Sequence, residues 1–293
     1  MNVGIFGTSY CGSTLTSYIF TKHPKVFSVG ESHWLVDKAP YNRKKILHDN
    51  CTICRDIPNE DCDFFTREFI DTLTMNNLVE KIEQKAKEKY DVDWVMYSDK
   101  HPYNYNRLFF NVNKKMDKAL VLFKRPEGFL HSFLRHYKIT HPDLSERQIF
   151  DDGIRFYIKI NRENQECISK NNIPVRYIFL EDLTKDPVKI IKYICDFLNI
   201  EFDNSLLQYW ENNNKFHQIG GNGSPKISTF NDGRVQRAYG KDTDAHKWYR
   251  KIHKKIVFDQ RWKDLDENYL DILKHHFHVQ ETFNKMLARR TYE

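Results

Sequence analysis

An eight-residue stretch near the start of the chain, "GTSYCGST" at positions 7 to 14, has residue types suited to holding an anion. Gly7, Gly12 and Thr14 fit the phosphate-loop pattern G-x-x-x-x-G-K-[ST], but Ser13 stands where that pattern has lysine. Backbone N–H groups at the start of the helix predicted after this loop would point at an anion. The missing lysine argues against hydrolysis of a nucleoside triphosphate. Taken alone, the loop is equally well explained as an ordinary strand–turn–helix connection.

A second candidate anion site follows a later apolar run. Lys124 and Arg125 come directly after the predicted strand, and Ser132 lies one to two turns into the next predicted helix. This spacing lets a basic group and a hydroxyl converge on one anion. A basic strand end followed by a helix cap is the structural alternative. Two anion sites at one edge of a sheet would suit a nucleotide that carries phosphates at both ends.

Short apolar runs alternate with amphipathic stretches, which predicts an α/β fold. Buried strands are expected at 3–6, 26–29, 94–97, 119–123 and 175–180. The clearest helix is predicted for Glu146 to Lys170, with Ser145 and Gln148 as a capping box, and another from Pro187 to Leu198 behind Asp186. The fold class that follows is a P-loop-like parallel sheet flanked by helices on both faces. In such a sheet ligands bind at the carboxyl ends of the strands.

The chain as a whole is expected to be one globular domain. At 293 residues with 40% hydrophobic content it can form a large core, and it has no repeat, linker or low-complexity segment. Core elements are expected in 1–33, 92–200 and 212–265, with an insertion at 34–91 and C-terminal helices at 266–293. No apolar run approaches the roughly 20 residues of a membrane span, and no leader precedes the first strand, so a cytoplasmic location is expected.

The net charge of +6 is spread along the chain, which disfavours nucleic acid as a partner. Among the six cysteines, Cys51-x-x-Cys54 lies between His48 and Cys62 and could form a zinc site. The second ligand pair that makes such a motif specific is missing, so free cysteines or one local disulfide are preferred to a metal. A zinc ion here would fix the insertion around 50–63 without taking part in chemistry.

At four places the sequence resembles the sulfotransferases that use 3′-phosphoadenylyl sulfate (PAPS), especially their bacterial and tyrosylprotein branch. "GTSYCGSTL" is similar to the loop that cradles the 5′-phosphosulfate, and Lys124, Pro126 and Ser132 match the second element of the family. "FLEDLTKDPVKIIKYICDFLNI" matches the third element, and "HQIGGNGSP" at 217–225 matches a late glycine-rich loop. The resemblance implies a sulfotransferase that needs no metal for its chemistry.

The resemblance implies the residues that would bind PAPS or its product adenosine 3′,5′-bisphosphate (PAP). They are Thr8, Ser9, Tyr10, Cys11, Gly12, Ser13, Thr14, Lys124, Arg125, Ser132, Tyr177, Gly220, Gly221, Asn222 and Arg234. Arg234 is expected to reach the 3′-phosphate. Two positions depart from the family pattern, because Tyr10 stands where most relatives have a basic residue and Leu180 where they have tyrosine. Tyr177 is the expected substitute for that tyrosine.

The resemblance also implies how transfer would proceed. Lys100, in "YSDKHPYNYNR", is expected to contact the sulfonate, and Glu31, in "HPKVFSVGESHW", to act as general base for in-line transfer. His101 and His33 are the alternative bases, and Glu31 could instead be a structural carboxylate paired with a lysine. The acceptor is expected to be a small molecule with a hydroxyl or amine, such as a natural product. A protein that binds PAP without transfer and a P-loop kinase remain alternatives.

Overall fold

The computed structural model describes residues 1–36, 51, 62–209, 217–220, 256 and 260–292. Its centre is a five-stranded sheet with the order β2-β3-β1-β4-β5. The strands are β1 (Asn2–Gly7), β2 (Val26–Gly30), β3 (Trp94–Lys100), β4 (Lys118–Phe123) and β5 (Val175–Phe179). Every neighbouring pair is parallel. All five predicted strands are therefore confirmed, and their carboxyl ends lie at one edge of the sheet.

The predicted end of the last strand is wrong by one residue. Strand β5 stops at Phe179, and Leu180 begins helix α8 (Leu180–Lys185). Two acidic residues, Glu181 and Asp182, lie in the first turn of α8, where carboxylates interact favourably with the helix dipole. This favours an early start of the helix over one more residue of strand.

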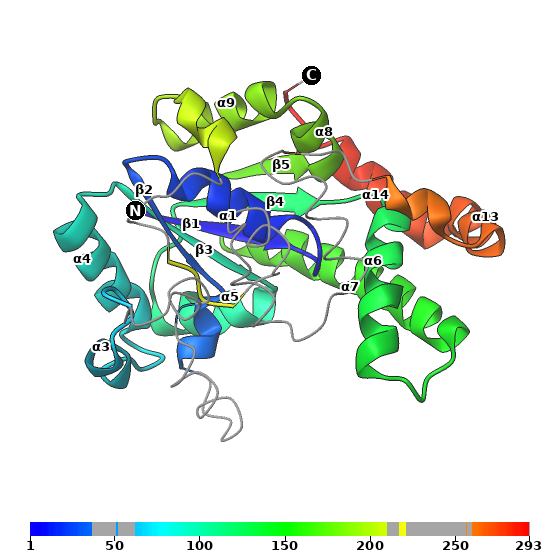
Figure 1. Ribbon diagram of the computed structural model, residues 1–293, viewed down its shortest axis with the longest axis horizontal. Helices are drawn as coiled ribbons and strands as arrows, with labels where there is room; N and C mark the ends of the chain where they lie inside the picture. The colour runs from blue at the N-terminus through cyan, green and yellow to red at the C-terminus, as the bar shows by residue number, and fades with distance from the viewer. Residues whose placement is uncertain (37–50, 52–61, 210–216, 221–255, 257–259, 293) are drawn as a thin grey trace, which may run out of the picture.

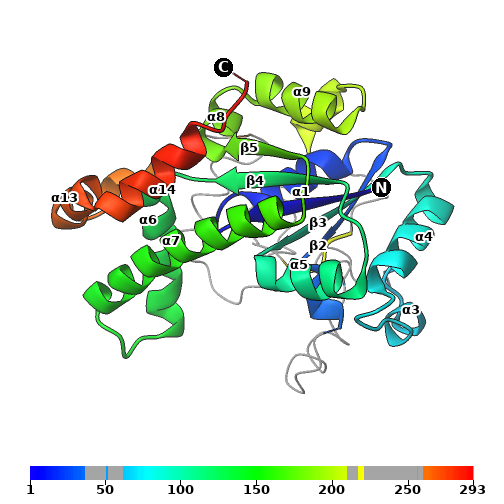
Figure 2. The same ribbon diagram turned by 180° about the vertical axis from the view of Figure 1, so that it is seen from behind.

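Helices cover both faces of the sheet (Figures 1 and 2). Helices α1 (Ser13–Thr21) and α9 (Pro187–Leu198) pack on one face, and α5 (Pro102–Leu108), α7 (Glu146–Lys170) and α14 (Phe277–Leu287) on the other. The remaining α-helices are α3 (Arg67–Asp71), α4 (Leu78–Tyr90), α6 (Pro126–Thr140), α8 and α13 (Glu267–His275). Short 3₁₀ helices are η1 (Ser32–Leu35), η3 (Phe110–Val112), η4 (Asn204–Gln208) and η5 (Arg261–Asp264). Within the described residues, no helix has both the length and the apolar character that a membrane span requires.

The two helices predicted from their caps begin and end as expected. The Ser145 hydroxyl accepts the Gln148 N–H at 3.3 Å, and the Gln148 side chain accepts the Ser145 N–H at 2.9 Å, which completes the capping box of α7. The Asp186 side chain caps α9 by accepting the Lys189 N–H at 3.1 Å. These caps satisfy N–H groups that have no partner inside the helix.

Strand β1 lies between β3 and β4. The chain runs from β1 to β2 and β3 on one side, and β4 and β5 extend the sheet on the other. At such a point the connections diverge and leave a crevice at the carboxyl edge, where ligands bind in open α/β sheets. The residues that follow β1, β2, β3 and β4 all open onto this edge.

Candidate active site

The loop after β1 ends in an uncapped helix start. Gly12 occupies the N-cap position of α1 with φ +93°, and it has no side chain that could cap the first-turn N–H groups. A Cβ at Gly12 would lie 2.5 Å from Leu180 Cδ1, so the loop and the start of α8 are in close contact. Ser13 and Thr14, in the first turn, are each 5% exposed. The first-turn N–H groups of a helix are donors suited to an anion. The N–H and hydroxyl of Ser13 also interact with the Cys11 thiol.

The other residues of this loop form its base and one wall. Thr8 and Cys11 are buried, and burial raises the pKa of the Cys11 thiol, which keeps it neutral. Ser9 is half-buried. Tyr10 adopts a left-handed conformation with φ +65°, and its ring lies 6.5 Å from Phe129 in α6. Tyr10 thus packs the loop against α6, and it supplies no positive charge in place of the basic residue of the family pattern.

Lys124 and Ser132, the residues of the second predicted anion site, lie next to each other. Lys124, directly after β4, donates to the Ser132 hydroxyl in α6 at 3.3 Å. Lys124 is only 6% exposed, and its carbonyl accepts a hydrogen bond from the Tyr157 hydroxyl at 3.0 Å. The ammonium group and the hydroxyl therefore converge at the carboxyl edge of the sheet.

Arg125 contacts Glu181, a residue that the sequence analysis did not assign to the site. The Arg125 N–H donates to Glu181 Oε1 at 3.2 Å, and its Nε lies 3.7 Å from the same oxygen. Burial raises the pKa of Glu181 to about 7, although Lys124 and Arg125 act to lower it. The Arg125 guanidinium also lies over the Trp262 ring, 4.3 Å from its centroid. This basic corner thus contains a carboxyl group that is half-protonated near neutral pH.

Glu31 and Lys100, predicted as base and sulfonate contact, form an ion pair at the opposite side of β1. Lys100 Nζ donates to Glu31 Oε1, and Trp34 Nε1 donates to Glu31 Oε2 at 3.0 Å. The side chains of the pair are 13% and 15% exposed. Burial alone would raise the pKa of Glu31, but Lys100 outweighs it and the pKa lies below its ordinary value. The pairing that the sequence analysis treated as an alternative role for Glu31 is therefore present, and its partner is the other predicted reactive residue.

The ion pair lies close to the anion loop. Lys100 ends β3 with φ +62°, and its Cα is paired in the sheet with that of Phe6, two residues before the loop begins at Thr8. Its charge also acts to lower the pKa of the Cys11 thiol, although burial prevails. An anion in the loop would therefore lie near the Lys100 ammonium group.

A histidine–aspartate pair lies beside the ion pair. His33 Nδ1 is 2.6 Å from Asp99 Oδ1, which also accepts the His33 N–H at 2.9 Å. Asp99 Oδ2 accepts the Ser32 hydroxyl at 2.8 Å. The Asp99 carboxylate is fully buried and orients the imidazole of His33. His33 was among the predicted bases, whereas Asp99 was not predicted, although it stands next to Lys100 in "YSDKHPYNYNR".

His101, the other alternative base, begins α5 as its N-cap residue, and its ring lies 5.6 Å from Phe156. Burial first, and then the charge of Lys100, lowers the pKa of His101 to about 4. The imidazole is therefore neutral at physiological pH.

The late glycine-rich loop reaches the same edge. Ile219 forms a parallel bridge with Gly30, and its carbonyl accepts the Glu31 N–H at 2.8 Å. At Gly220, which has φ +61°, an added Cβ would lie 3.1 Å from Glu31 Cβ. Gly220 thus allows this loop to approach Glu31. Gly221, Asn222 and Arg234 lie outside the described residues.

Two further predicted groups are placed elsewhere. Tyr177 lies within β5, two residues before its end, and its hydroxyl accepts a hydrogen bond from Arg289 at 2.6 Å. Its described contacts are thus with the C-terminal segment. Cys51 and Cys62 do come together, but around His217, while Cys54 and His48 lie outside the described residues. His217 begins the quoted glycine-rich motif, and nothing in its sequence context relates it to cysteines in the insertion.

The comparisons with known proteins identify the fold. No protein-family model and no curated protein sequence matches the chain. Among solved structures, the sulfotransferase domain from the curacin biosynthetic pathway matches with a TM-score of 0.63 and 17% identity, over 97% of this chain and 96% of that one. The sulfotransferase domain from the Synechococcus PCC 7002 olefin synthase matches with a TM-score of 0.53 and 15% identity, over 92% and 94%. The chain therefore has the fold of sulfotransferase domains.

Proposed function

We propose that this protein is a sulfotransferase that moves the sulfonate of PAPS to a hydroxyl or amine of a small molecule. The observation that carries the proposal is the arrangement at the carboxyl edge. There an uncapped helix start after β1 has the Glu31–Lys100 pair on one side and the Lys124–Ser132 pair on the other. The fold shared with sulfotransferase domains supports the same reaction class.

In this proposal the nucleotide spans β1. The 5′-phosphosulfate lies at the start of α1, where Ser13 and Thr14 provide backbone and hydroxyl donors. We assign the 3′-phosphate to Lys124 and Ser132, and the 3.3 Å contact between the ammonium group and the hydroxyl supports this assignment. No divalent cation is assigned a role, because the loop and the lysines supply the donors that the anion needs.

The transfer step uses the ion pair on the other side of β1. The acceptor oxygen or nitrogen attacks sulfur, the bond from sulfur to the bridging oxygen breaks, and PAP leaves with that electron pair. The acceptor proton goes to the Glu31 carboxylate. Lys100 must first turn from Glu31 to a sulfonate oxygen. Because Lys100 is what lowers the pKa of Glu31, donor binding makes Glu31 a stronger base as it occupies Lys100.

A small polar acceptor is favoured over a macromolecule. By name, the two matched domains come from a biosynthetic pathway and an olefin synthase, which supports an acceptor among the products or intermediates of biosynthesis. The Glu31 side chain is only 13% exposed, and Trp34 donates a hydrogen bond to it. This burial favours a small acceptor that can reach Glu31 over a macromolecule that lies across the surface.

The first experiment is thermal unfolding with PAP, with ATP and magnesium, and with adenosine 5′-monophosphate. A ligand that binds only the folded state raises Tm by mass action, and we expect the largest increase with PAP. A larger increase with ATP and magnesium would contradict the proposal and favour the kinase. PAP binding followed by failed sulfonate transfer from PAPS across phenols, alcohols and amines would favour a protein that binds the nucleotide without transfer, in which the Glu31–Lys100 pair never opens.

A further inference from the structure

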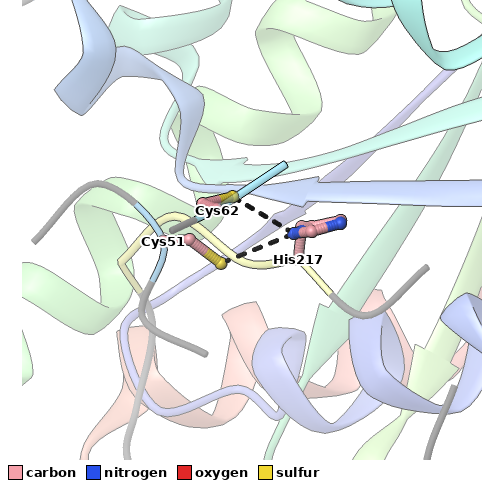
Figure 3. Close-up of side chains that lie close together, drawn as sticks. All are labelled: Cys51, Cys62 and His217. Carbon is pink, nitrogen blue, oxygen red and sulfur yellow. Dashed lines mark hydrogen bonds between the residues drawn. The ribbon is translucent and has the colours of Figure 1, made fainter. Parts of the chain in front are cut away.

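Three side chains that are far apart in the sequence meet in a buried cluster outside the transfer site (Figure 3). Cys62 Sγ lies 3.3 Å and Cys51 Sγ 3.8 Å from Nδ1 of His217. The potential ligand atoms all lie within 4.8 Å of one another. Cys51 is 1% exposed and His217 4% exposed. Cys62 is partly exposed. Both sulfur atoms therefore point at the same ring nitrogen in a largely buried space.

The other ring nitrogen of His217 has polar partners of its own. His217 Nε2 lies 2.9 Å from the Tyr90 hydroxyl and 3.2 Å from Asp63 Oδ1. With the ring proton on Nε2, next to this carboxylate, the lone pair of Nδ1 faces the two sulfur atoms. Metal-bound histidines in proteins are held in the same way, with the non-ligating N–H donated to a carboxylate or another oxygen.

Each sulfur atom also accepts a backbone hydrogen bond. The Phe65 N–H donates to Cys62 Sγ at 3.1 Å, and the Gln218 N–H donates to Cys51 Sγ at 3.5 Å. Backbone N–H donors of this kind stabilise charge on a thiolate ligand. Aromatic rings enclose the cluster, with Phe64 at 5.7 Å and Phe27 at 6.2 Å from the imidazole, measured between ring centroids.

We propose that Cys51, Cys62 and His217 bind a structural zinc ion. Two thiolates and one neutral imidazole are the ligand types that zinc prefers, and two thiolates balance its double positive charge in a buried place. Binding releases the two thiol protons to solvent, so charge and atoms balance. Zinc in structural sites takes four ligands, and the fourth is a group beyond these three.

The site would act on Glu31 through the backbone. Two residues after His217, the Ile219 N–H donates to the Val29 carbonyl at 2.9 Å, and the Ile219 carbonyl accepts the Glu31 N–H at 2.8 Å. The zinc ion would join two points of the insertion, Cys51 and the segment before α3 that carries Cys62, to this short bridge. Its role is therefore to position the edge of the sheet that carries Glu31, and it takes no part in sulfonate transfer.

The test is the metal content of the full chain, purified without chelators and measured by inductively coupled plasma mass spectrometry. We expect zinc in a one-to-one ratio to protein, lost in Cys62→Ala and in His217→Ala. The matched control is Cys167→Ala, because Cys167 is a buried cysteine of α7 that is not part of this cluster, and it should keep its zinc. Neither PAPS nor an acceptor is needed, so this result is independent of the proposed function.

A second measurement does not depend on variants that fold poorly. The wild-type protein is stripped with a chelator under reducing conditions and then titrated with cobalt, a spectroscopic substitute for zinc. Thiolate-to-cobalt charge-transfer absorption, and a Tm that zinc restores but magnesium does not, are the expected results. Reduced protein that binds neither zinc nor cobalt would overturn the proposal. So would a Cys51–Cys62 disulfide in the native protein, seen as a mass lower by two hydrogen atoms that returns on reduction.

Discussion

The carboxyl edge of the sheet and the cluster of Cys51, Cys62 and His217 are assembled in opposite ways. At the edge, Glu31 and Lys124 directly follow strands, Lys100 ends one, and Ser13, Thr14 and Ser132 lie in the helices that come next, so the strand–helix units of the parallel sheet bring them together. In the cluster, His217 meets cysteines that are 155 and 166 residues away. The segment 217–220 belongs to both regions, since His217 lies in the cluster and Gly220 lies against Glu31. Sheet topology therefore determines the candidate active site, whereas packing between distant loops determines the cluster. Variants can test the two regions separately.

The largest expected effect separates chemistry from binding. Glu31→Gln should lower kcat by about 10²- to 10⁴-fold, because an amide cannot take the proton of the acceptor. The Kd for PAP, measured by calorimetry, should change little, and the zinc content should not change. The exposed Glu88 of α4 provides the control variant Glu88→Gln. Unchanged turnover in Glu31→Gln would remove Glu31 as base and direct attention to His33 and His101.

A second effect concerns stability at the carboxyl edge. The pKa of Glu181 is about 7 in the folded protein, above its ordinary value of 4.5, so between these values the folded state binds more protons than the unfolded state. The free energy of unfolding should therefore fall as pH rises from about 4.5 to 7, by up to about 3 kcal/mol. Glu181→Gln should remove most of this fall.

Chemical denaturation at pH 5 and pH 8 measures this fall in the free energy of unfolding. The exposed Glu88 of α4 lies outside this corner, and Glu88→Gln is again the control. An identical pH dependence in wild type and Glu181→Gln would show that Glu181 is ionised throughout, and that the basic corner neutralises it.

A third effect tests nucleotide binding on the far side of β1. Lys124→Ala should weaken PAP binding by about 10- to 100-fold, and Ser132→Ala by less, because a charge-assisted hydrogen bond contributes more than a neutral one. Lys138 also lies on α6 but pairs with Glu146 at the surface, so Lys138→Ala is the matched control. Equal Kd values for Lys124→Ala and wild type would show that the 3′-phosphate binds elsewhere. The zinc content should be the same in all three variants.

The smallest expected effect is on stability alone and should leave both the candidate active site and the cluster unchanged. Ser145→Ala removes one half of the α7 capping box and should cost about 1 kcal/mol of stability, or a fall in Tm of about 2–4 °C. Turnover, the Kd for PAP and zinc content should stay as in wild type. A loss of activity here would mean that modest destabilisation alone impairs the site, and the other variants would need correction for it.

These two regions also mark what a sequence can predict. The sequence could predict the five strands from their periodicity and the bounds of α7 and α9 from their caps. It could also predict the approach of Lys124 to Ser132, because the two residues are eight apart in one strand–helix unit. The pairing of Glu31 with Lys100 was foreseeable only as an alternative. It depends on β2 lying next to β3, which local patterns do not determine.

Other features could not be predicted for a physical reason. The position of His217 depends on its contacts with Phe27 in β2 and Tyr90 in α4. The raised pKa of Glu181 depends on its burial, and a sequence pattern does not state how deeply a helix start is covered. In both cases the property arises from contacts between segments that are distant in the sequence.

The position of β1 in the centre of the sheet separates the residues assigned to the transfer step from those assigned to the 3′-phosphate. On our assignment, Glu31 and Lys100 of the β2–β3 half act on the acceptor and the sulfonate, whereas the nucleotide is held by the loop after the central β1 and by the residues that follow β4. Substitutions after β2 or β3 could then alter the reaction while affinity for the donor persists, and substitutions after β4 could do the reverse. Such an architecture lets a lineage exchange acceptors, or lose turnover altogether, without rebuilding the part of the fold that recognises the nucleotide.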